Sequence, residues 1–292
     1  MSRQEKAQKV RASLAKLAEA SDKLSVNELR IILALERIVA RLTSAKELEK
    51  HLVYKGGFVL MKLLGSSRFT RDLDALGVGI EKADVARLVP KALEKDLADG
   101  FWFGDIKLTP MDDQGDYGAL RFDSAFHIGQ PEKGKISKLS RIHFDVGFCD
   151  KIPSKLQPVK TDSLIPGEKS ISWKVYPPEY IFSEKLQTLV IRADANSRAK
   201  DVFDLVLLYD KCTDQNALHK AVQLTFKNRE TTVPPSFSEF AKKLNVRQIE
   251  ISWRSVKLES LDMDFATAWQ RLLSMLEEFD SSLIELVTDT KF

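Results

Sequence analysis

The chain has 292 residues, of which 43% are hydrophobic and 30% charged, as in an ordinary soluble globular protein. Two cysteines and four histidines exclude a disulfide framework and a structural zinc site, and they fit a reducing cytoplasm. Neither Cys149 nor Cys212 has an obvious activating partner. No stretch of about 18 uncharged apolar residues is present, and the basic N-terminus lacks an apolar core, so we expect neither a membrane span nor a secretory signal.

The charge of the chain is unevenly distributed. Residues 259–292 hold eight acidic and two basic residues, a net charge of −6. Because the whole chain has a net charge of +3, residues 1–258 carry +9. A polyanion would therefore approach residues 1–258 more easily than the C-terminal segment. A solvated surface of mixed charge explains the same distribution.

The hydrophobic periodicity predicts an α+β fold, with a mixed-sheet core and a mainly helical C-terminal half. Ser25 with Glu28 predicts a capping box at the start of the second helix. The expected helices span residues 2–20, 25–42, 44–50, 58–64, 81–99, 179–191 and 200–209, with further helix beyond 213. Strands are expected at 52–54, 72–78 and within 101–150, and 151–178 is expected to be irregular. We therefore divide the chain into N-terminal helices (1–50), a core (51–176) and a helical domain (177–292).

Carboxylates recur in two strand-like segments. Asp72 and Asp74 stand two residues apart, so on a strand both point to one face and could ligate one hard divalent cation. A turn or an exposed sheet edge would explain the same pair. In residues 141–148, His143 and Asp145 alternate with hydrophobic residues. If a neighbouring strand brought Asp145 beside Asp72 and Asp74, the three carboxylates would need cations between them, as in two-Mg²⁺ phosphoryl or nucleotidyl transfer.

Two glycines precede these carboxylates. Gly56 and Gly57 follow a short strand and open a predicted helix, where backbone N–H groups and the positive helix end could bind a phosphate. A tight turn would need the same two residues. The combined order of strand, Gly-Gly, helix and Asp-x-Asp strand is more specific than either motif alone.

Three blocks of the sequence resemble a known family. Residues 54–76 (YKGGFVLMKLLGSSRFTRDLDAL), 184–192 (EKLQTLVIR) and 198–205 (RAKDVFDL) are similar, in this order, to the motifs of the AbiEii-type toxin nucleotidyltransferases. This family, which includes the MenT toxins, belongs to the DNA polymerase beta-like nucleotidyltransferase superfamily. The resemblance implies that the core is a polymerase beta-like nucleotidyltransferase domain. One departure is Phe58, which stands where many members have a hydroxyl residue that contacts a phosphate; Thr70, or Ser66 and Ser67, could supply that hydroxyl.

The resemblance assigns roles to residues that the pattern alone leaves open. Lys185 could reach solvent from its apolar helix, and Arg198, Asp201 and Asp204 could form an intrahelical ion-pair stripe. The family motifs instead imply that Lys185 contacts the triphosphate, and that Asp204 acts as general base or orients Lys185. Asp204 is preferred to Asp201 because it matches the last Asp of the block. The implied site residues are catalytic Asp72, Asp74, Lys185 and Asp204; nucleotide-binding Gly56, Gly57, Arg68, Thr70 and Lys185; and metal-binding Asp72, Asp74 and Asp145.

The resemblance also implies a function. The expected reaction is Mg²⁺-dependent transfer of NMP from an NTP to a hydroxyl acceptor, the 3′ end of tRNA. The enzyme would be the toxin of a toxin–antitoxin (abortive infection) pair, with an antitoxin protein as partner. Two alternatives are the same chemistry on a small-molecule or protein hydroxyl, and a catalytically idle module that binds a partner.

Overall fold

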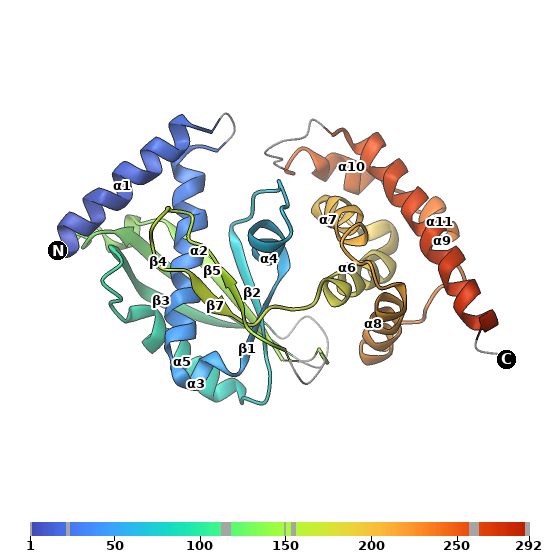
Figure 1. The fold of residues 1–292 in the computed structure, drawn as a ribbon, viewed down its shortest axis with the longest axis horizontal. Coiled ribbons are helices and arrows are strands. Elements are labelled where there is room, and N and C mark those ends of the chain that lie inside the picture. The colour runs from blue at the N-terminus through green and yellow to red at the C-terminus, as the bar shows by residue number, and fades with distance from the viewer. Residues whose placement is uncertain are drawn as a thin grey trace. The chain divides into compact units, whose positions relative to one another are not determined.

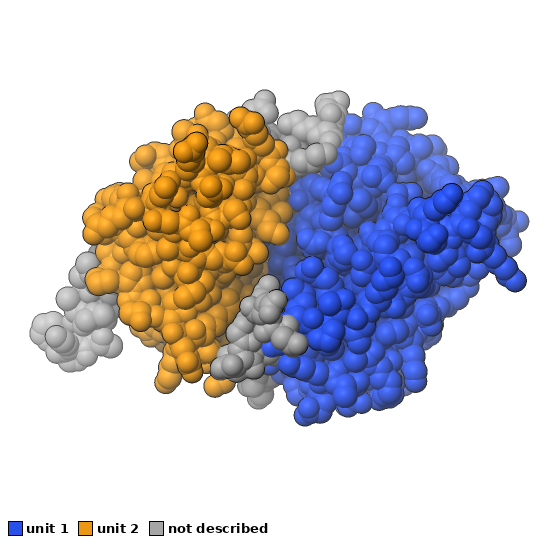
Figure 2. Space-filling model, turned by 180° about the vertical axis from the view of Figure 1, so that it is seen from behind, with its two compact units in different colours: residues 1–63, 69–149, 154–175 blue, residues 64–68, 150–153, 176–292 orange. Residues whose placement is uncertain are grey.

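The computed structural model divides the chain into two compact units (Figures 1 and 2). Unit 1 consists of residues 1–63, 69–149 and 154–175, and unit 2 of residues 64–68, 150–153 and 176–292. The structure describes residues 2–21, 24–111, 118–148, 150–152, 156–256 and 263–289, with side chains as far as residue 282. Cys149 lies outside these ranges.

A mixed sheet is the centre of unit 1. In the described ranges its five strands follow the order β1-β2-β5-β4-β3. Their bounds are β1 (Leu52–Lys55), β2 (Asp72–Gly77), β3 (Phe101–Met111), β4 (Ala119–Ile128) and β5 (Arg141–Gly147). Strands β2 and β5 are parallel, and the other three neighbouring pairs are antiparallel. The alternating sequence of β5 accordingly buries Ile142, Phe144 and Val146 and leaves the intervening side chains partly exposed.

The strand register brings the predicted acidic residues together. In the parallel β2–β5 pair, Asp74 lies opposite Asp145, and Asp72 lies opposite His143. Directly paired residues point to the same face of a sheet. Asp72, Asp74 and Asp145 therefore share one face, as the period-two pattern predicted.

Helices of unit 1 pack around this sheet. They are α1 (Arg3–Glu19), α2 (Val26–Ser44), α3 (Lys46–Glu49), α4 (Gly56–Leu63) and α5 (Lys82–Glu94). Helix α2 begins at the predicted capping box, in which Ser25 and Glu28 bond each other's backbone N–H, and it contacts α1, α5 and β5. Helix α4 packs against β1 and β2 (Figure 1). This contact places the Gly56-Gly57 turn beside the strand that carries Asp72 and Asp74.

A buried ion pair ties α2 to the start of β3. Arg41 and Asp99 are 0% and 8% exposed, and their side chains form two hydrogen bonds of 2.6 and 3.0 Å. Arg41 also donates to the carbonyl of Phe101, the first residue of β3. The sequence pattern did not identify this pair, because neither residue belongs to a recognisable motif.

Unit 2 is helical in the part that the structure describes. Its helices are α6 (Pro178–Arg192), α7 (Ala199–Tyr209), α8 (Gln215–Asn228), α9 (Phe237–Lys242), α10 (Arg247–Trp253) and α11 (Phe265–Asp289). Helix α6 contacts α7 and α8, and α11 contacts α7 and α9. Phe182, Phe237 and Phe279 are buried and meet at ring-centroid distances of 5.6 and 5.8 Å.

The predicted α+β fold class is confirmed, and two local expectations need correction. Helix α5 ends at Glu94 rather than at 99, because Lys95 adopts an extended backbone with a ψ of 128°. Ala98, with a positive φ of 54°, also lies outside the helical region. The segment 151–178, expected to be irregular, contains a hairpin of β6 (Val159–Thr161) and β7 (Ile171–Trp173). None of the helices in the described ranges is long and apolar enough to span a membrane.

Candidate active site

The acidic face of the sheet is bordered closely by the glycine turn. Gly56 has a φ of +76°, a conformation that strongly favours glycine. A Cβ atom at this position would lie 2.0 Å from Oδ2 of Asp74. The Gly-Gly pair therefore does more than close a turn, because the missing side chain leaves the space that the Asp74 carboxylate occupies.

The third predicted acid is engaged by an arginine. Arg121 of β4 lies opposite Asp145 in the antiparallel β4–β5 register. Its Nε and Nη2 atoms donate to the two carboxylate oxygens of Asp145 at 2.8 and 2.6 Å. The hydrogen bond and charge of Asp145, with the charges of Asp72 and Asp74, raise the pKa of Arg121. The guanidinium thus lies in the field of all three carboxylates.

The donor set fits a hard divalent cation. Asp72 and Asp74 offer carboxylate oxygens on one face, which are the ligands that Mg²⁺ prefers, and the glycine turn keeps bulk away from Asp74. Among the described residues, no group of three or more His, Cys, Asp or Glu side chains is already arranged to hold a metal ion. Asp72 and Asp74 could therefore hold a divalent cation, while Asp145 is held by Arg121.

Phe58 and two of the residues expected to offer a hydroxyl to a phosphate are buried. Phe58 is 1% exposed and packs edge-on against Trp173 at 5.7 Å, so it belongs to the core of unit 1. Thr70 and Ser66 are largely buried, and the Ser66 hydroxyl accepts a hydrogen bond from the backbone N–H of Arg68 at 3.3 Å. Because Phe58 is buried and has no hydroxyl, the backbone of the glycine turn is the candidate for a phosphate contact there.

The remaining predicted residues form a separate buried group in unit 2. Lys185 of α6 is 9% exposed, and its Nζ lies 2.6 Å from Asp201 and 2.8 Å from Asp204, both on α7. Asp204 is fully buried and accepts two hydrogen bonds of 2.8 Å from Arg68. Arg198 also pairs with Asp201 at 2.5 Å. Lys185 therefore does not extend to solvent, and the ion-pair stripe expected along α7 extends to α6 and to Arg68.

The charges of this group shift one another's pKa values. Burial alone would raise the pKa of Asp201 and Asp204, but the cations around them outweigh burial and lower both values. Burial alone would lower the pKa of Lys185, but the two carboxylates outweigh it and raise the value. All three groups are therefore charged at neutral pH, and a buried carboxylate of lowered pKa is a poor general base.

Sequence reasoning missed two contributors to these groups. Arg121 was not considered, although it alternates with Asp123 on the partly exposed face of β4. Asp201 was ranked below Asp204, yet both contact Lys185. An i, i+3 relation to Arg198 was visible for Asp201 in the sequence, whereas the partner of Arg121 lies 24 residues away and depends on the strand register.

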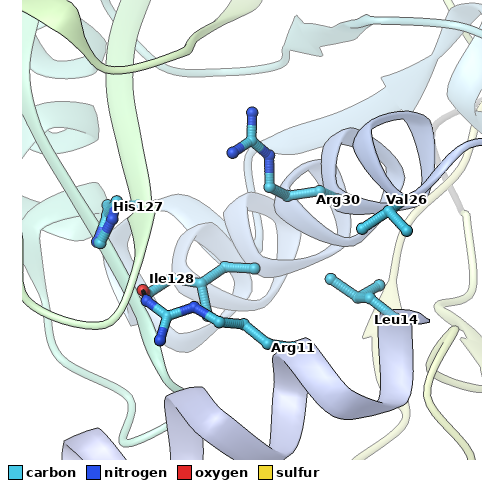
Figure 3. Close-up of a pocket in the computed structure, with 6 residues that line it drawn as sticks. All are labelled: Arg11, Leu14, Val26, Arg30, His127 and Ile128. Atoms are coloured by element: carbon cyan, nitrogen blue, oxygen red, sulfur yellow. Dashed lines mark hydrogen bonds between the residues drawn. The ribbon is translucent and has the colours of Figure 1, made fainter. Parts of the chain in front are cut away.

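A cavity of about 210 Å³ in unit 1 lies among α1, α2 and the end of β4 (Figure 3). It is lined by Arg11, Leu14, Val26, Arg30, His127 and Ile128. None of these is a predicted site residue, and Arg11 donates to the backbone carbonyl of Ile128. The cavity is separate from the carboxylate face.

The fold is that of the nucleotidyltransferases. MenT4, a nucleotidyltransferase toxin from Mycobacterium tuberculosis H37Rv, is 19% identical to this chain, with a TM-score of 0.62 over 93% of this chain and 89% of that one. JHP933 from Helicobacter pylori is 18% identical, with a TM-score of 0.58 over 92% of this chain and 98% of that one. At these identities the likeness establishes the fold alone. No curated protein matches the chain.

The family follows from a match to the sequence. The model of the AbiEii nucleotidyl transferase toxins of type IV toxin–antitoxin systems matches residues 37–288. The chain belongs to this AbiEii family, as the three sequence blocks indicated, and it is a nucleotidyltransferase.

Replacement of Gly56 tests the close approach of the glycine turn to Asp74. Gly65 is a matched control, because its φ is +69° but no atom lies within 4 Å of an added Cβ. We expect Gly65→Ala to lower the free energy of unfolding by about 1–2 kcal/mol from the left-handed backbone alone. Gly56→Ala should cost clearly more in urea unfolding, since its Cβ would also collide with Asp74. Equal losses would contradict the contact.

The buried ion cluster of unit 2 predicts a pH-dependent stability. The folded-state pKa of Asp201 is lowered, so its contribution is present above the unfolded value of about 3.9 and is lost as the pH falls below it. The difference in unfolding free energy between wild type and Asp201→Asn should therefore shrink from pH 6 to pH 2. Urea titrations at each pH measure it, with the exposed Asp84→Asn as a control that should change little throughout. A difference that is constant with pH would refute the assignment.

Proposed function

We propose that this nucleotidyltransferase uses Mg²⁺ to transfer NMP from an NTP to the 3′ end of tRNA. The observation that carries the proposal is the β2–β5 register, which places Asp74 beside Asp145 and puts Asp72 on the same face. Carboxylates gathered in this way serve phosphoryl and nucleotidyl transfer when metal ions lie among them.

Different residues of unit 1 would bind the metal ion and the triphosphate. Asp72 and Asp74 would hold Mg²⁺, with Asp145 as a third ligand, and the bound metal would offset the negative charge of the triphosphate. Backbone N–H groups at Gly56 and Gly57, at the positive end of α4, would contact phosphate oxygens. The acceptor hydroxyl would form a bond to the α-phosphorus as the bond to pyrophosphate breaks, and its proton would pass to solvent. Catalysis would depend on positioning and electrostatics.

The group in unit 2 supports a charge role rather than proton transfer. Lys185 would supply positive charge to the phosphates, as the family motif implies. Asp204 binds both Lys185 and Arg68 and is fully buried, which favours its role as the residue that orients Lys185. The contact of Asp201 with the same ammonium suggests that both carboxylates hold it in place.

The net charge of the chain and its family support the proposed acceptor. The net charge of +9 over residues 1–258 favours a polyanion such as RNA. A small-molecule or protein hydroxyl is the second candidate, because the carboxylate face by itself selects no acceptor. The family description, a toxin of a type IV system, supports an antitoxin partner.

Incubation with α-labelled NTPs and Mg²⁺ tests the transfer. We expect label on the 3′ end of total tRNA, and we expect Asp72→Asn and Asp74→Asn each to reduce its rate by about 100-fold or more, since metal binding supplies several kcal/mol. Asp84→Asn, an exposed carboxylate of α5, is the matched control and should retain the rate. Label found only on protein or small molecules would refute the tRNA acceptor, and unchanged rates in both variants would refute the metal ligands.

Expression in a bacterial host tests the toxin role. Induction of the wild-type chain should arrest growth, whereas Asp72→Asn at equal abundance should not, because the arrest depends on the transfer reaction. Co-expression of the reading frame next to the gene should restore growth if it encodes the antitoxin. Arrest that persists with Asp72→Asn would show that toxicity does not come from nucleotidyl transfer.

A further inference from the structure

Four charged side chains form one row across the sheet. The registers place Lys55 of β1 opposite Asp74, Asp74 opposite Asp145, and Asp145 opposite Arg121 of β4. Neighbouring strands lie about 4.8 Å apart, so adjacent members of the row are close enough to interact. The two carboxylates at the centre of the row repel each other and need positive charge nearby.

Arg121 meets that need for Asp145. Both carboxylate oxygens of Asp145 accept hydrogen bonds from the Arg121 guanidinium, in the planar geometry that suits this pairing. The guanidinium therefore stabilises one of the carboxylates that would hold a metal ion.

The pair is accessible enough to open. The side chain of Arg121 is 42% exposed and that of Asp145 is 20% exposed. By contrast, the side chains of Lys185 and Asp204, which also form an ion pair, are 11% and 0% exposed. A partly exposed ion pair is screened by water and is weak, so a divalent cation can displace the arginine from Asp145.

We propose that Arg121 is a positioning residue that holds Asp145 when no metal is bound and competes with the metal ion for that carboxylate. This inference rests on the proposed metal role of Asp72, Asp74 and Asp145. Metal binding then includes the exchange of one cation for another at Asp145, and Arg121 sets the metal concentration at which the carboxylates are filled. The arginine leaves the carboxylate with its charge intact and stays beside the site.

Mn²⁺ binding to the full-length protein without nucleotide tests the proposal. Free Mn²⁺ is measured by electron paramagnetic resonance at constant ionic strength. Arg121→Gln should bind Mn²⁺ on the order of tenfold more tightly than wild type, because a competing charge next to the carboxylates is removed. Arg121→Lys should fall between the two, since a lysine keeps the charge but loses the two-point geometry. A gain of affinity cannot arise from partial misfolding.

Two further variants separate competition from a general charge effect. Arg87→Gln removes the same charge from an exposed pair with Asp84 on α5 and should leave Mn²⁺ affinity at the wild-type value. In Asp145→Asn, Mn²⁺ binding should weaken, and adding Arg121→Gln to that variant should produce a clearly smaller gain than it does in the wild-type background, because the arginine then no longer competes for Asp145. Wild-type or weaker Mn²⁺ binding by a folded Arg121→Gln, or the same gain in Arg87→Gln, would overturn the proposal.

The outcomes also distinguish this proposal from the proposed function. If Asp72→Asn and Asp74→Asn leave Mn²⁺ affinity unchanged, the metal assignment fails, and the competition fails with it. If those variants lose Mn²⁺ while Arg121→Gln binds it as wild type does, the metal assignment stands and only the competition is refuted. Thermal unfolding of each variant confirms that a folded chain is compared.

Discussion

The parallel pairing of β2 with β5 is the constraint on which the carboxylate face depends. Residues 72–74 and 145 are about seventy positions apart in the chain, and only this register makes Asp74 and Asp145 direct neighbours. A shift by one residue would turn one of the two side chains into the hydrophobic core. The buried residues between them, Leu73 and Phe144, fix the register, because they cannot be exposed without losing apolar burial. The core of unit 1 thus determines the geometry of its charged face.

The two groups of charged residues differ in their exposure to water. In unit 2, Lys185, Asp201 and Asp204 are removed from water, and each charge is stabilised by at least one opposite charge at hydrogen-bond distance. Loss of one member would leave an uncompensated buried charge, which would destabilise the fold. In unit 1, water reaches the Arg121–Asp145 pair, and a charge there can be exchanged. Burial between two carboxylates suits the charge role proposed for Lys185, and a partly exposed pair suits the metal exchange proposed for Asp145.

The fold class and the shared face of Asp72 and Asp74 could be predicted from the sequence because they follow local rules. Period-two alternation identified β2 and β5, and the Gly-Gly and Asp-x-Asp motifs are each continuous in the chain. The pairings were not accessible in this way. Arg121 and Asp145, Arg41 and Asp99, and Arg68 and Asp204 each join residues from different elements, with sequence separations of 24, 58 and 136. Lys185 was identified by its block, but its burial between two aspartates depends on how α6 packs against α7.

Carboxylates gathered on one face of a sheet have an inherent cost for the fold. Carboxylates close enough to share one ion repel each other when it is absent, so the geometry that favours metal binding disfavours the folded protein without metal. Arg121 offsets this repulsion while it is hydrogen-bonded to Asp145, one of the proposed ligands. Stability without the metal and affinity for it are therefore opposed at this residue. The backbone of Gly56 adds no such conflict, since it makes room for Asp74 without contributing a charge. The balance between stability without the metal and affinity for it thus depends on one partly exposed ion pair, Arg121 with Asp145. The strands that carry this pair need not move.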